Sequence, residues 1–272
     1  MTSEILKMTY KNKKVWITGA SSGIGEALAY AFAREGAALI LSARSEKELA
    51  RVKANCLGAV SIDIVLLDIG DHNGVFSTVK TTLERLGGGV DVLINNAGLS
   101  QRSLTRETDF SVDERMINVN LLGTIAMTKA VLPAMLAQKS GQIVVISSIM
   151  GKLGAPLRSS YAAAKHGLHG FFDTLRAETH DDGLRVLLVC PGYVRTNVSL
   201  NALTADGKAQ GTMDAATDNG FTTEEVAKRI LSALRNNKEE LIIAAARERL
   251  AVYAKRFMPL LLSKIVRKAR TT

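Results

Sequence analysis

A tyrosine and a lysine in the second half of the chain are spaced so that together they could transfer a proton. In "SSYAAAKHG" (159–167), Tyr161 and Lys165 are four residues apart. On a helix this spacing places both side chains on one face, one turn apart. A free tyrosine, with a pKa of about 10, exchanges protons poorly near neutral pH, and a nearby cation lowers that pKa by about 1–3 units. The pair therefore predicts a tyrosine acid or base assisted by a lysine; the alternative is a packed tyrosine beside a solvated lysine.

A glycine-rich stretch near the start of the chain could bind a phosphate group. "TGASSGIG" (18–25) follows an apolar run and opens a helical one. Glycines permit a tight turn, and the N-terminus of the following helix offers N–H groups and a positive dipole end to a pyrophosphate. The expected members of this dinucleotide site are Gly19, Ser21, Ser22, Gly23, Ile24 and Gly25. A turn without a ligand and a site for S-adenosylmethionine are the alternatives.

The end of the second apolar run, "LSARS" (41–45), bears on the choice between NAD and NADP. NAD sites usually carry an acid here for the ribose 2′-hydroxyl, whereas an arginine accommodates the 2′-phosphate of NADP. This chain has Ala43 and then Arg44, whose guanidinium can pair bidentately with a phosphate. We therefore expect NADP (NADPH) as the cofactor, with a merely exposed Arg44 as the alternative. Asp68, after the third run, is placed to meet the adenine or to cap local structure.

Seven short apolar runs alternate with helical stretches and must position these residues. The runs are continuous rather than alternating with polar residues, which favours strands covered on both faces of a parallel sheet. The order predicts right-handed βαβ units and an α/β fold, a Rossmann-type doubly wound parallel sheet in a single domain over residues 1–246. The expected strands are 14–18, 37–43, 61–68, 91–98, 141–148, 184–190 and 239–244.

One long polar stretch, residues 193–220, breaks this alternation. It is rich in Asn, Asp, Thr and Gly and follows the sixth expected strand. Ligands bind outside the carboxyl ends of the strands in such sheets, and long irregular segments there are often lids. We expect a substrate lid rather than an ordinary surface loop.

Six short motifs, in order, resemble the short-chain dehydrogenase/reductase superfamily from Lys14 to about residue 245. They are "TGASSGIG" (18–25), "NNAG" (95–98), "NLLG" (120–123), "VVISS" (144–148), "YAAAK" (161–165) and "PG" (191–192) leading to Thr196. Ser148 precedes Tyr161 by thirteen residues, as in the family pattern. The resemblance implies an NADP-dependent oxidoreductase that interconverts a ketone or aldehyde and an alcohol by hydride transfer.

The resemblance also implies a role for each matching residue. Tyr161 would be the general acid in reduction or the base in oxidation and would also contact the cofactor. Lys165 would bind the nicotinamide ribose and lower the tyrosine pKa. Ser148 would hydrogen-bond the substrate oxygen, and Asn120 would hold a water in a proton relay toward Lys165. The other expected cofactor contacts are Asn95, Ala97 and Gly98 on the adenine-ribose side and Pro191, Gly192, Val194 and Thr196 beside the nicotinamide. Ser148 could instead be a strand-end turn residue, and Asn120 a polar residue bonded to the backbone.

Composition limits the class of protein. The chain has 272 residues, 47% of them hydrophobic and 22% charged, which suits a sizeable core. Cys56 and Cys190 suggest reduced thiols rather than a disulfide framework. The sequence shows no signal peptide and no run of about eighteen apolar residues, so no spanning helix is expected. The histidines, at 72, 166, 169 and 180, form no metal-ligand pattern, and no acid or thiol is expected to complete a metal site.

The formal net charge of +9 is concentrated at the C-terminus. Residues 247–272 hold eight Lys or Arg and one acid, so they carry +7 and the rest of the chain only +2. A nearly neutral body lacks the basic docking face of a nucleic-acid-binding domain. Apolar residues at 250, 253, 257, 261 and 265 recur at nearly helical period, and Pro259 interrupts the helix. This basic amphipathic extension either lies on an anionic membrane surface or packs on the protein or a partner subunit.

The lid and the start of this extension resemble the branch of the superfamily that contains dehydrogenase/reductase member 7B, whose proposed substrates include acyl-dihydroxyacetone phosphate. The resemblance and the extension together suggest a lipid-like or steroid-like substrate. That branch often carries an N-terminal membrane anchor, and none is evident before the first strand. We expect a homodimer or homotetramer that uses the helices holding Asn120 and Tyr161, in the cytoplasm or peripheral to a membrane. The rival hypotheses are a non-catalytic NADP sensor and a membrane-surface binding protein.

Overall fold

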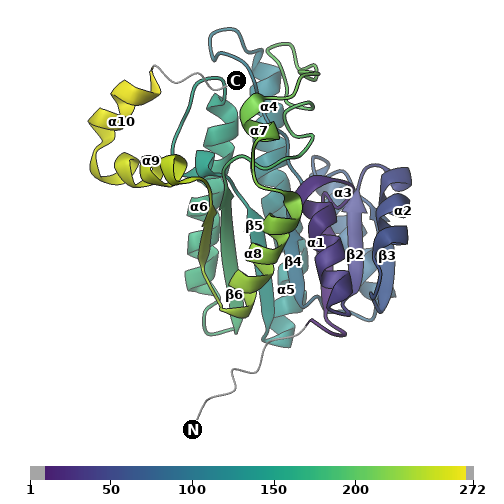
Figure 1. Cartoon of the computed structure of the whole chain (residues 1–272). Coiled ribbons are helices and arrows are strands. Elements are labelled where there is room, and N and C mark those ends of the chain that lie inside the picture. Colours follow the sequence, from purple (N-terminus) through teal and green to yellow (C-terminus); the bar gives the residue numbers. More distant parts are fainter. Residues whose placement is uncertain (1–9, 268–272) are drawn as a thin grey trace.

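Seven parallel strands form one sheet in the order β3-β2-β1-β4-β5-β6-β7 (Figure 1). The computed structural model describes residues 10–267. The strands are β1 (Lys14–Thr18), β2 (Ala38–Ala43), β3 (Ser61–Leu66), β4 (Val92–Asn95), β5 (Gly141–Ile146), β6 (Leu184–Pro191) and β7 (Glu240–Ile243). The seven predicted strands and the doubly wound α/β architecture are confirmed.

Several strands are shorter than the sequence suggested. β4 ends at Asn95 rather than at 98, and β5 ends at Ile146 rather than at 148. The residues that follow each strand leave the ladder and line a cavity at the carboxyl edge of the sheet. The strand order reverses between β1 and β4, which is the point where sheets of this kind bind ligands.

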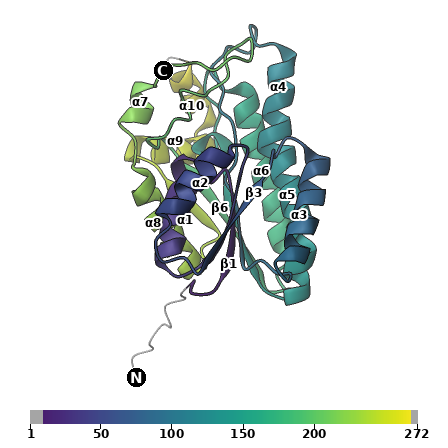
Figure 2. The ribbon, with the colours of Figure 1, turned by 90° about the vertical axis from the view of Figure 1, so that its right-hand side faces the viewer.

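Helices cover both faces of the sheet (Figure 2). One face carries α1 (Gly23–Arg34), α2 (Glu46–Asn55) and α8 (Thr223–Arg235), and the other carries α3 (His72–Arg85), α5 (Gly123–Gln138) and α6 (Ser159–Glu178). Successive side chains of β1 pack on opposite faces of the sheet. Val15 and Ile17 belong to the core that contains Phe32, while Trp16 belongs to the core that contains Met127. Both faces are therefore buried, which explains why the strands read as continuous apolar runs.

One long helix joins two elements of the second layer. It consists of α4 (Phe110–Ile117), a π-helical turn η1 (Asn118–Leu122) and α5. Its length and hydropathy would let it cross a membrane, whereas no spanning helix was predicted from the sequence. Its buried apolar residues, which include Met127, Val131 and Met135, pack into the core between the sheet and α3. Such packing is characteristic of a core helix.

Two segments stand outside the three layers. The predicted lid, 193–220, is mostly turns with one short helix, α7 (Ala215–Asp218), and many of its residues line the cavity. After β7 the chain forms α9 (Ala246–Phe257) and α10 (Pro259–Val266), which project to one side of the sheet (Figure 1). The predicted interruption at Pro259 is confirmed, because α10 begins there. Lys268 and Arg270 of the predicted basic extension lie outside the described residues.

Candidate active site

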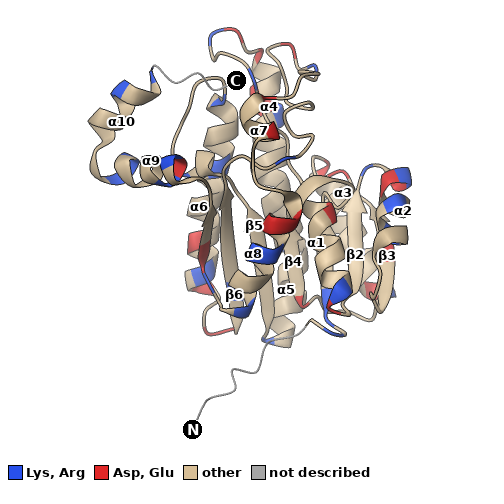
Figure 3. Cartoon of the chain, viewed as in Figure 1, with Lys and Arg blue, Asp and Glu red and all other residues tan. Residues whose placement is uncertain are grey.

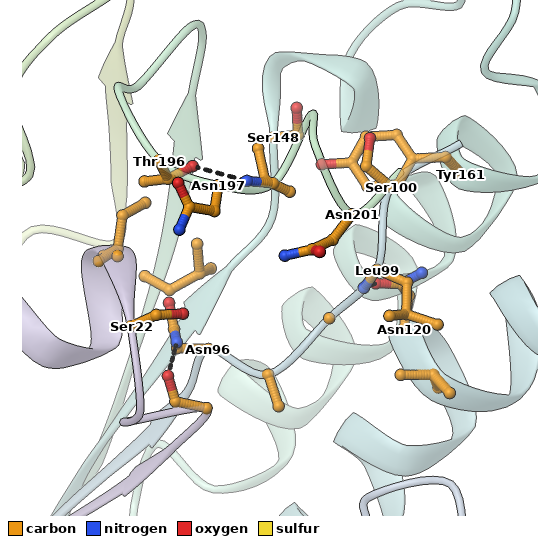
Figure 4. Close-up of a pocket in the computed structure, with 18 of the residues that line it drawn as sticks. Ser22, Asn96, Leu99, Ser100, Asn120, Ser148, Tyr161, Thr196, Asn197 and Asn201 are labelled. Atoms are coloured by element: carbon orange, nitrogen blue, oxygen red, sulfur yellow. Dashed lines mark hydrogen bonds between the residues drawn. The ribbon is translucent and has the colours of Figure 1, made fainter. Parts of the chain in front are cut away.

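A cavity of about 930 Å³ lies at the carboxyl edge of the sheet. The loops after β1, β2, β3, β4, β5 and β6 contribute to its walls, and the lid contributes the rest (Figure 4). One end is formed by the glycine-rich turn and the other by residues of α6 and the lid. The cavity is large enough for a dinucleotide together with a small substrate.

The glycine-rich turn has the geometry of a phosphate site. Gly19 and Gly23 have φ of +64° and +58°, a region that favours glycine. A Cβ on Gly19 would lie 2.8 Å from Ala97 Cα, so only glycine permits this approach of the two loops. Ser22 is the N-cap of α1 but forms no side-chain cap hydrogen bond, and the backbone of Gly23 and Ile24 lines the cavity. Backbone N–H groups at this helix N-terminus therefore suit a pyrophosphate.

Gly25 was predicted to contact the cofactor, but it does not line the cavity. A Cβ at this position would lie 2.3 Å from Gly19 O and 2.5 Å from Asn96 Nδ2. Asn96 Nδ2 donates to Gly19 O at 3.0 Å, so Gly25 leaves room for the bond that holds the turn against the loop after β4. Gly25 therefore packs beneath the glycine-rich turn.

Gly25→Ala is expected to lower the free energy of unfolding by about 1–3 kcal/mol, because overpacking at a backbone contact forces a shift. Since the turn must move, dinucleotide affinity should fall as well. Urea unfolding and cofactor titration by intrinsic fluorescence measure the two effects. Gly170→Ala on α6 is the matched control, because a Cβ there meets nothing within 4 Å. Equal stability of the two variants would contradict this explanation.

Most of the other predicted cofactor residues line the cavity. They are Ser21, Ser22, Arg44, Asp68, Ala97, Gly98, Pro191, Gly192, Val194 and Thr196. Arg44 is exposed, whereas the nearby Arg51 is held by Glu26 and Glu48. Asp68 Oδ1 accepts a hydrogen bond from Gly70 N at 2.9 Å, which fits the alternative prediction that Asp68 caps local structure. Asp68 also lines the cavity.

Asn95 lies away from the cavity, and Asn96 takes the place predicted for it. Asn95 is buried, and its Nδ2 donates to Thr128 Oγ1 of α5 at 2.9 Å. Asn96 lines the cavity and joins the ends of β1 and β4 through Thr18. Asn95 is still within β4 and faces a helix, while Asn96 follows the strand and turns toward the open edge. The strand boundary, which the sequence leaves uncertain by a few residues, decides between them.

The four predicted catalytic residues meet at one wall of the cavity. Ser148 follows β5, Tyr161 and Lys165 lie one turn apart on α6, and Asn120 lies in the π-helical turn. The Tyr161 ring points from α6 toward the end of β5, where Ser148 lies (Figure 4). Lys165 Nζ lies 5.8 Å from the centroid of the Tyr161 ring and donates to Ile146 O at 2.8 Å. Side chains from three separate elements are thus brought together, as expected.

The environment of the tyrosine differs from the sequence expectation. Burial raises the pKa of Tyr161, and the hydrogen bond with Ser148 and the charges of Arg158 and Arg102 oppose this. Burial also lowers the pKa of Lys165, to about 8. The pKa of Tyr161 is therefore raised rather than lowered as the sequence predicted, and the phenol is protonated at neutral pH.

Asn120 is fully buried at a break in the helix. Its Oδ1 accepts from Leu99 N at 2.9 Å and its Nδ2 donates to Met116 O at 3.1 Å. A Cβ on Gly98 would lie 2.6 Å from this Oδ1 and 3.7 Å from Lys165 Nζ, so Gly98 separates the two side chains. π-helical turns often occur at functional sites, and this one brings Asn120 to the loop after β4. The Asn120 side chain is hydrogen-bonded to the backbone, as the alternative prediction for this residue stated.

The prediction that no acid or thiol meets the histidines is wrong for His169. Its Nε2 lies 3.6 Å from Cys190 Sγ and 3.2 Å from Ser147 Oγ, and ligand atoms of His169, Cys190 and Glu240 lie within 4.8 Å of one another. Burial raises the pKa of Cys190 to about 12 and lowers that of His169 to about 4, so both are neutral near pH 7. Glu240 is paired with Lys152. His169 and Cys190 meet because β6 packs beside α6, and the spacing of residues along the sequence does not reveal such a contact.

A buried ion pair beside Tyr161 was not predicted at all. Arg102 Nη2 lies 2.5 Å from Asp214 Oδ2, and Arg158 Nη2 lies 3.7 Å from the same oxygen. Both arginines line the cavity, and their side chains are only 6% exposed, like that of Asp214 at 3%. The pair ties the lid to the loop after β4. Arg102 and Asp214 are 112 residues apart, and no local pattern in the sequence links them.

The comparisons with known proteins agree with this geometry. A family model described as short chain dehydrogenase matches residues 13–206. A dehydrogenase/reductase SDR family protein 7-like of Anopheles gambiae is 42% identical over 262 residues, which cover 94% of this chain and 82% of that protein. Dehydrogenase/reductase SDR family member 7B of Xenopus laevis is 41% identical over 259 residues, covering 93% and 80%.

Solved structures give the same result. An alcohol dehydrogenase from Thermococcus sibiricus, complexed with 5-hydroxy-NADP, is 30% identical with a TM-score of 0.74, covering 86% of this chain and 96% of that one. Levodione reductase is 26% identical with a TM-score of 0.76 and the same coverage. The chain belongs to the short-chain dehydrogenase/reductase family of nicotinamide-dependent oxidoreductases, in the branch of member 7B.

Proposed function

We propose that the protein is an NADP-dependent oxidoreductase that interconverts a ketone or aldehyde and an alcohol, with Tyr161 as general acid and base. The observation that carries the proposal is the convergence of Ser148, Tyr161 and Lys165 on the cavity that the glycine-rich turn closes at its other end. A nicotinamide dinucleotide bound along this cavity supplies or accepts the hydride. The residues of the chain bind it, orient the substrate and handle the proton.

The reduction needs a proton donor beside the carbonyl oxygen. The hydroxyl of Ser148 donates a hydrogen bond to that oxygen, and Tyr161 transfers its proton as the oxygen gains negative charge. The buried Lys165 ammonium, beside the ring, stabilises the tyrosinate that remains. Because burial raises the tyrosine pKa, the phenol is protonated at pH 7 and ready for reduction. Alcohol oxidation, which needs the tyrosinate, should require higher pH.

The preference for NADP is proposed from Arg44. Its exposed guanidinium lines the cavity directly after β2, where no acid is present to bind a ribose 2′-hydroxyl. Arg44→Ala is expected to weaken NADPH binding about tenfold or more while leaving NADH binding within about twofold, since a charge-assisted bond to the 2′-phosphate is lost. Isothermal titration with both cofactors measures this. Arg34→Ala, at the far end of α1, is the control, and an equal loss for NADPH and NADH would contradict the assignment.

We also propose an apolar, lipid-like or steroid-like substrate. Leu99 and Tyr161 pack against a cluster of Val112, Met116 and Leu203, and Leu203 belongs to the lid. Of these residues Leu99, Tyr161 and Leu203 line the cavity, so its wall is apolar beside the proposed proton donor. The member 7B resemblance supports a lipid substrate, and membership of the family supports the proposal that the protein forms a homodimer or homotetramer.

The proposed function is tested by cofactor oxidation with a panel of carbonyls from small diketones to long-chain keto lipids and steroids. NADPH oxidation that increases with the apolar size of the carbonyl supports the proposal. Cofactor binding without turnover of any member, in either direction, would favour the non-catalytic sensor instead.

A further inference from the structure

The C-terminal helices expose an unusual amount of apolar surface. Seven of the fourteen large hydrophobic side chains that are exposed within residues 10–267 lie between positions 250 and 265. They are Leu250, Tyr253, Phe257, Met258, Leu260, Leu261 and Ile265. Contiguous exposed apolar surface usually marks an interaction site. We refer to these seven residues as the apolar patch.

The patch is ordered on the two helices rather than scattered. Leu250, Tyr253 and Phe257 follow the i, i+3, i+7 spacing of one face of α9. Leu261 and Ile265 are four residues apart on α10, and Met258 and Leu260 lie at the junction between the helices. Each helix therefore presents a continuous apolar stripe.

Little of either helix is used to pack against the protein. Within 246–266, the buried apolar residues are Ala254 and Leu262, and α9 and α10 pack mainly on each other. A hollow remains between α10 and the loop 153–156. The alternative prediction, in which the extension packs on its own domain, holds for only one narrow side of the two helices. The described residues leave the apolar patch uncovered.

The charges around the patch are almost all positive (Figure 3). The six exposed cations of this segment are Arg247, Arg249, Lys255, Arg256, Lys264 and Arg267. Arg249 and Arg256 are seven residues apart, so they follow one edge of the α9 stripe. The single acid, Glu248, is turned toward the protein: its Oε2 accepts from Ala245 N at 2.9 Å and would meet a Cβ on Gly192 at 2.4 Å.

A second copy of this chain fits the patch poorly. A two-fold interface places the same surface against itself, so the cations of one copy would face those of the other. A surface that is both apolar and negatively charged matches the patch and its basic border. A bilayer containing anionic lipids has these two properties, and long basic side chains can reach its headgroups while their neighbours enter the acyl boundary.

We propose that α9 and α10 dock on an anionic lipid bilayer through the apolar patch, with Arg249 and Arg256 at its border contacting lipid headgroups. The helices leave the sheet at the carboxyl end of β7, the same edge that holds the cavity, and Glu248 lies beside the cavity residue Gly192 (Figure 1). Docking therefore brings the cavity end of the molecule to the lipid surface. This inference does not depend on the proposed reaction.

The test is co-sedimentation of the full chain with vesicles of phosphatidylcholine alone and of phosphatidylcholine with about 30% phosphatidylserine. The expected result is pelleting with the anionic vesicles only, decreasing as the salt concentration rises, because salt screens the headgroup contacts. Failure to pellet with anionic vesicles at low salt would overturn the proposal, and so would equal pelleting with both compositions.

Paired variants separate the patch from general surface properties. Phe257→Ser with Leu260→Ser removes side chains that are 75% and 82% exposed, and should lower the vesicle partition coefficient at least tenfold. The matched control is Leu57→Ser with Phe110→Ser, whose side chains are 77% and 74% exposed and lie elsewhere; it should bind like wild type. Because all four side chains are exposed, both double variants should fold, which thermal melting checks.

A second pair tests the charges. Arg249→Gln with Arg256→Gln should lower binding to anionic vesicles about tenfold or more, since each basic residue near an anionic leaflet contributes about fivefold. Lys53→Gln with Lys80→Gln removes the same charge from the body of the protein and should have less than a threefold effect. Equal effects of the two pairs would overturn the proposal. So would analytical ultracentrifugation showing that Phe257→Ser with Leu260→Ser dissociates an oligomer while vesicle binding is unchanged, since the patch would then bind a second copy.

Discussion

Tyr161→Phe is expected to lower the rate of NADPH-dependent carbonyl reduction by about 10²–10⁴-fold. Phenylalanine keeps the ring and its packing against the cluster of Val112, Met116 and Leu203 but cannot donate a proton, and a positioned general acid typically contributes this factor. Because the hydroxyl points toward Ser148 rather than toward the glycine-rich turn, NADPH affinity should change little. Steady-state kinetics with one reactive carbonyl, combined with a cofactor titration, measures both quantities.

The matched control for this variant is Tyr253→Phe, which removes an exposed tyrosine hydroxyl from α9. It should retain wild-type kinetics. If Tyr161→Phe kept more than about half of the wild-type rate, another group would have to supply the proton, and the proposed mechanism would be wrong.

Asp214→Asn is expected to destabilise the protein by about 3–5 kcal/mol, the usual cost of leaving a buried charge without its partner. The change keeps the shape of the side chain but removes the carboxylate that Arg102 contacts through two nitrogens. Urea denaturation should show a lower midpoint with an unchanged slope. The control is Asp206→Asn, whose pair with Lys208 is exposed and should contribute little. Similar midpoints for the two variants would contradict the importance of the buried pair.

The same pair predicts how stability depends on pH. Burial raises the pKa of Asp214, but the hydrogen bond and the charge of Arg102 outweigh it, so the pKa lies below its ordinary value. A depressed folded-state pKa gives stability that is fully present above the unfolded-state pKa, about 3.9, and is lost as the pH falls through the folded value. The stability difference between wild type and Asp214→Asn should be constant from pH 7 to pH 5 and shrink below about pH 4. A difference that instead grows in acid would show the opposite sign of coupling.

The fold and much of the site could be predicted because they depend on local patterns. Continuous apolar runs indicate strands with two buried faces. In β1, for example, the neighbouring residues Val15 and Trp16 pack into the cores on opposite faces of the sheet. The glycine turn and the Tyr161–Lys165 spacing are equally local, because each lies within a single turn or helix. These features require no knowledge of distant residues.

The rest depends on contacts between distant segments or on one-residue boundaries. Whether Asn95 or Asn96 faces the cavity is decided by where β4 ends. The pairing of Arg102 with Asp214 requires the lid to fold over the loop after β4. The direction of the Tyr161 pKa shift was predicted wrongly because burial, which residue spacing does not report, outweighs the hydrogen bond with Ser148 and the charges of Arg158 and Arg102.

The most direct test of the proposed function is to follow the transferred hydrogen. NADPH carrying deuterium at the hydride position is oxidised with the best carbonyl of the panel, and the product is analysed by mass spectrometry. The proposal predicts one deuterium per product alcohol, one product per NADPH consumed, and formation of this product about 10²–10⁴-fold more slowly with Tyr161→Phe. Consumption of NADPH without deuterium in the product, or unchanged transfer in Tyr161→Phe, would contradict it.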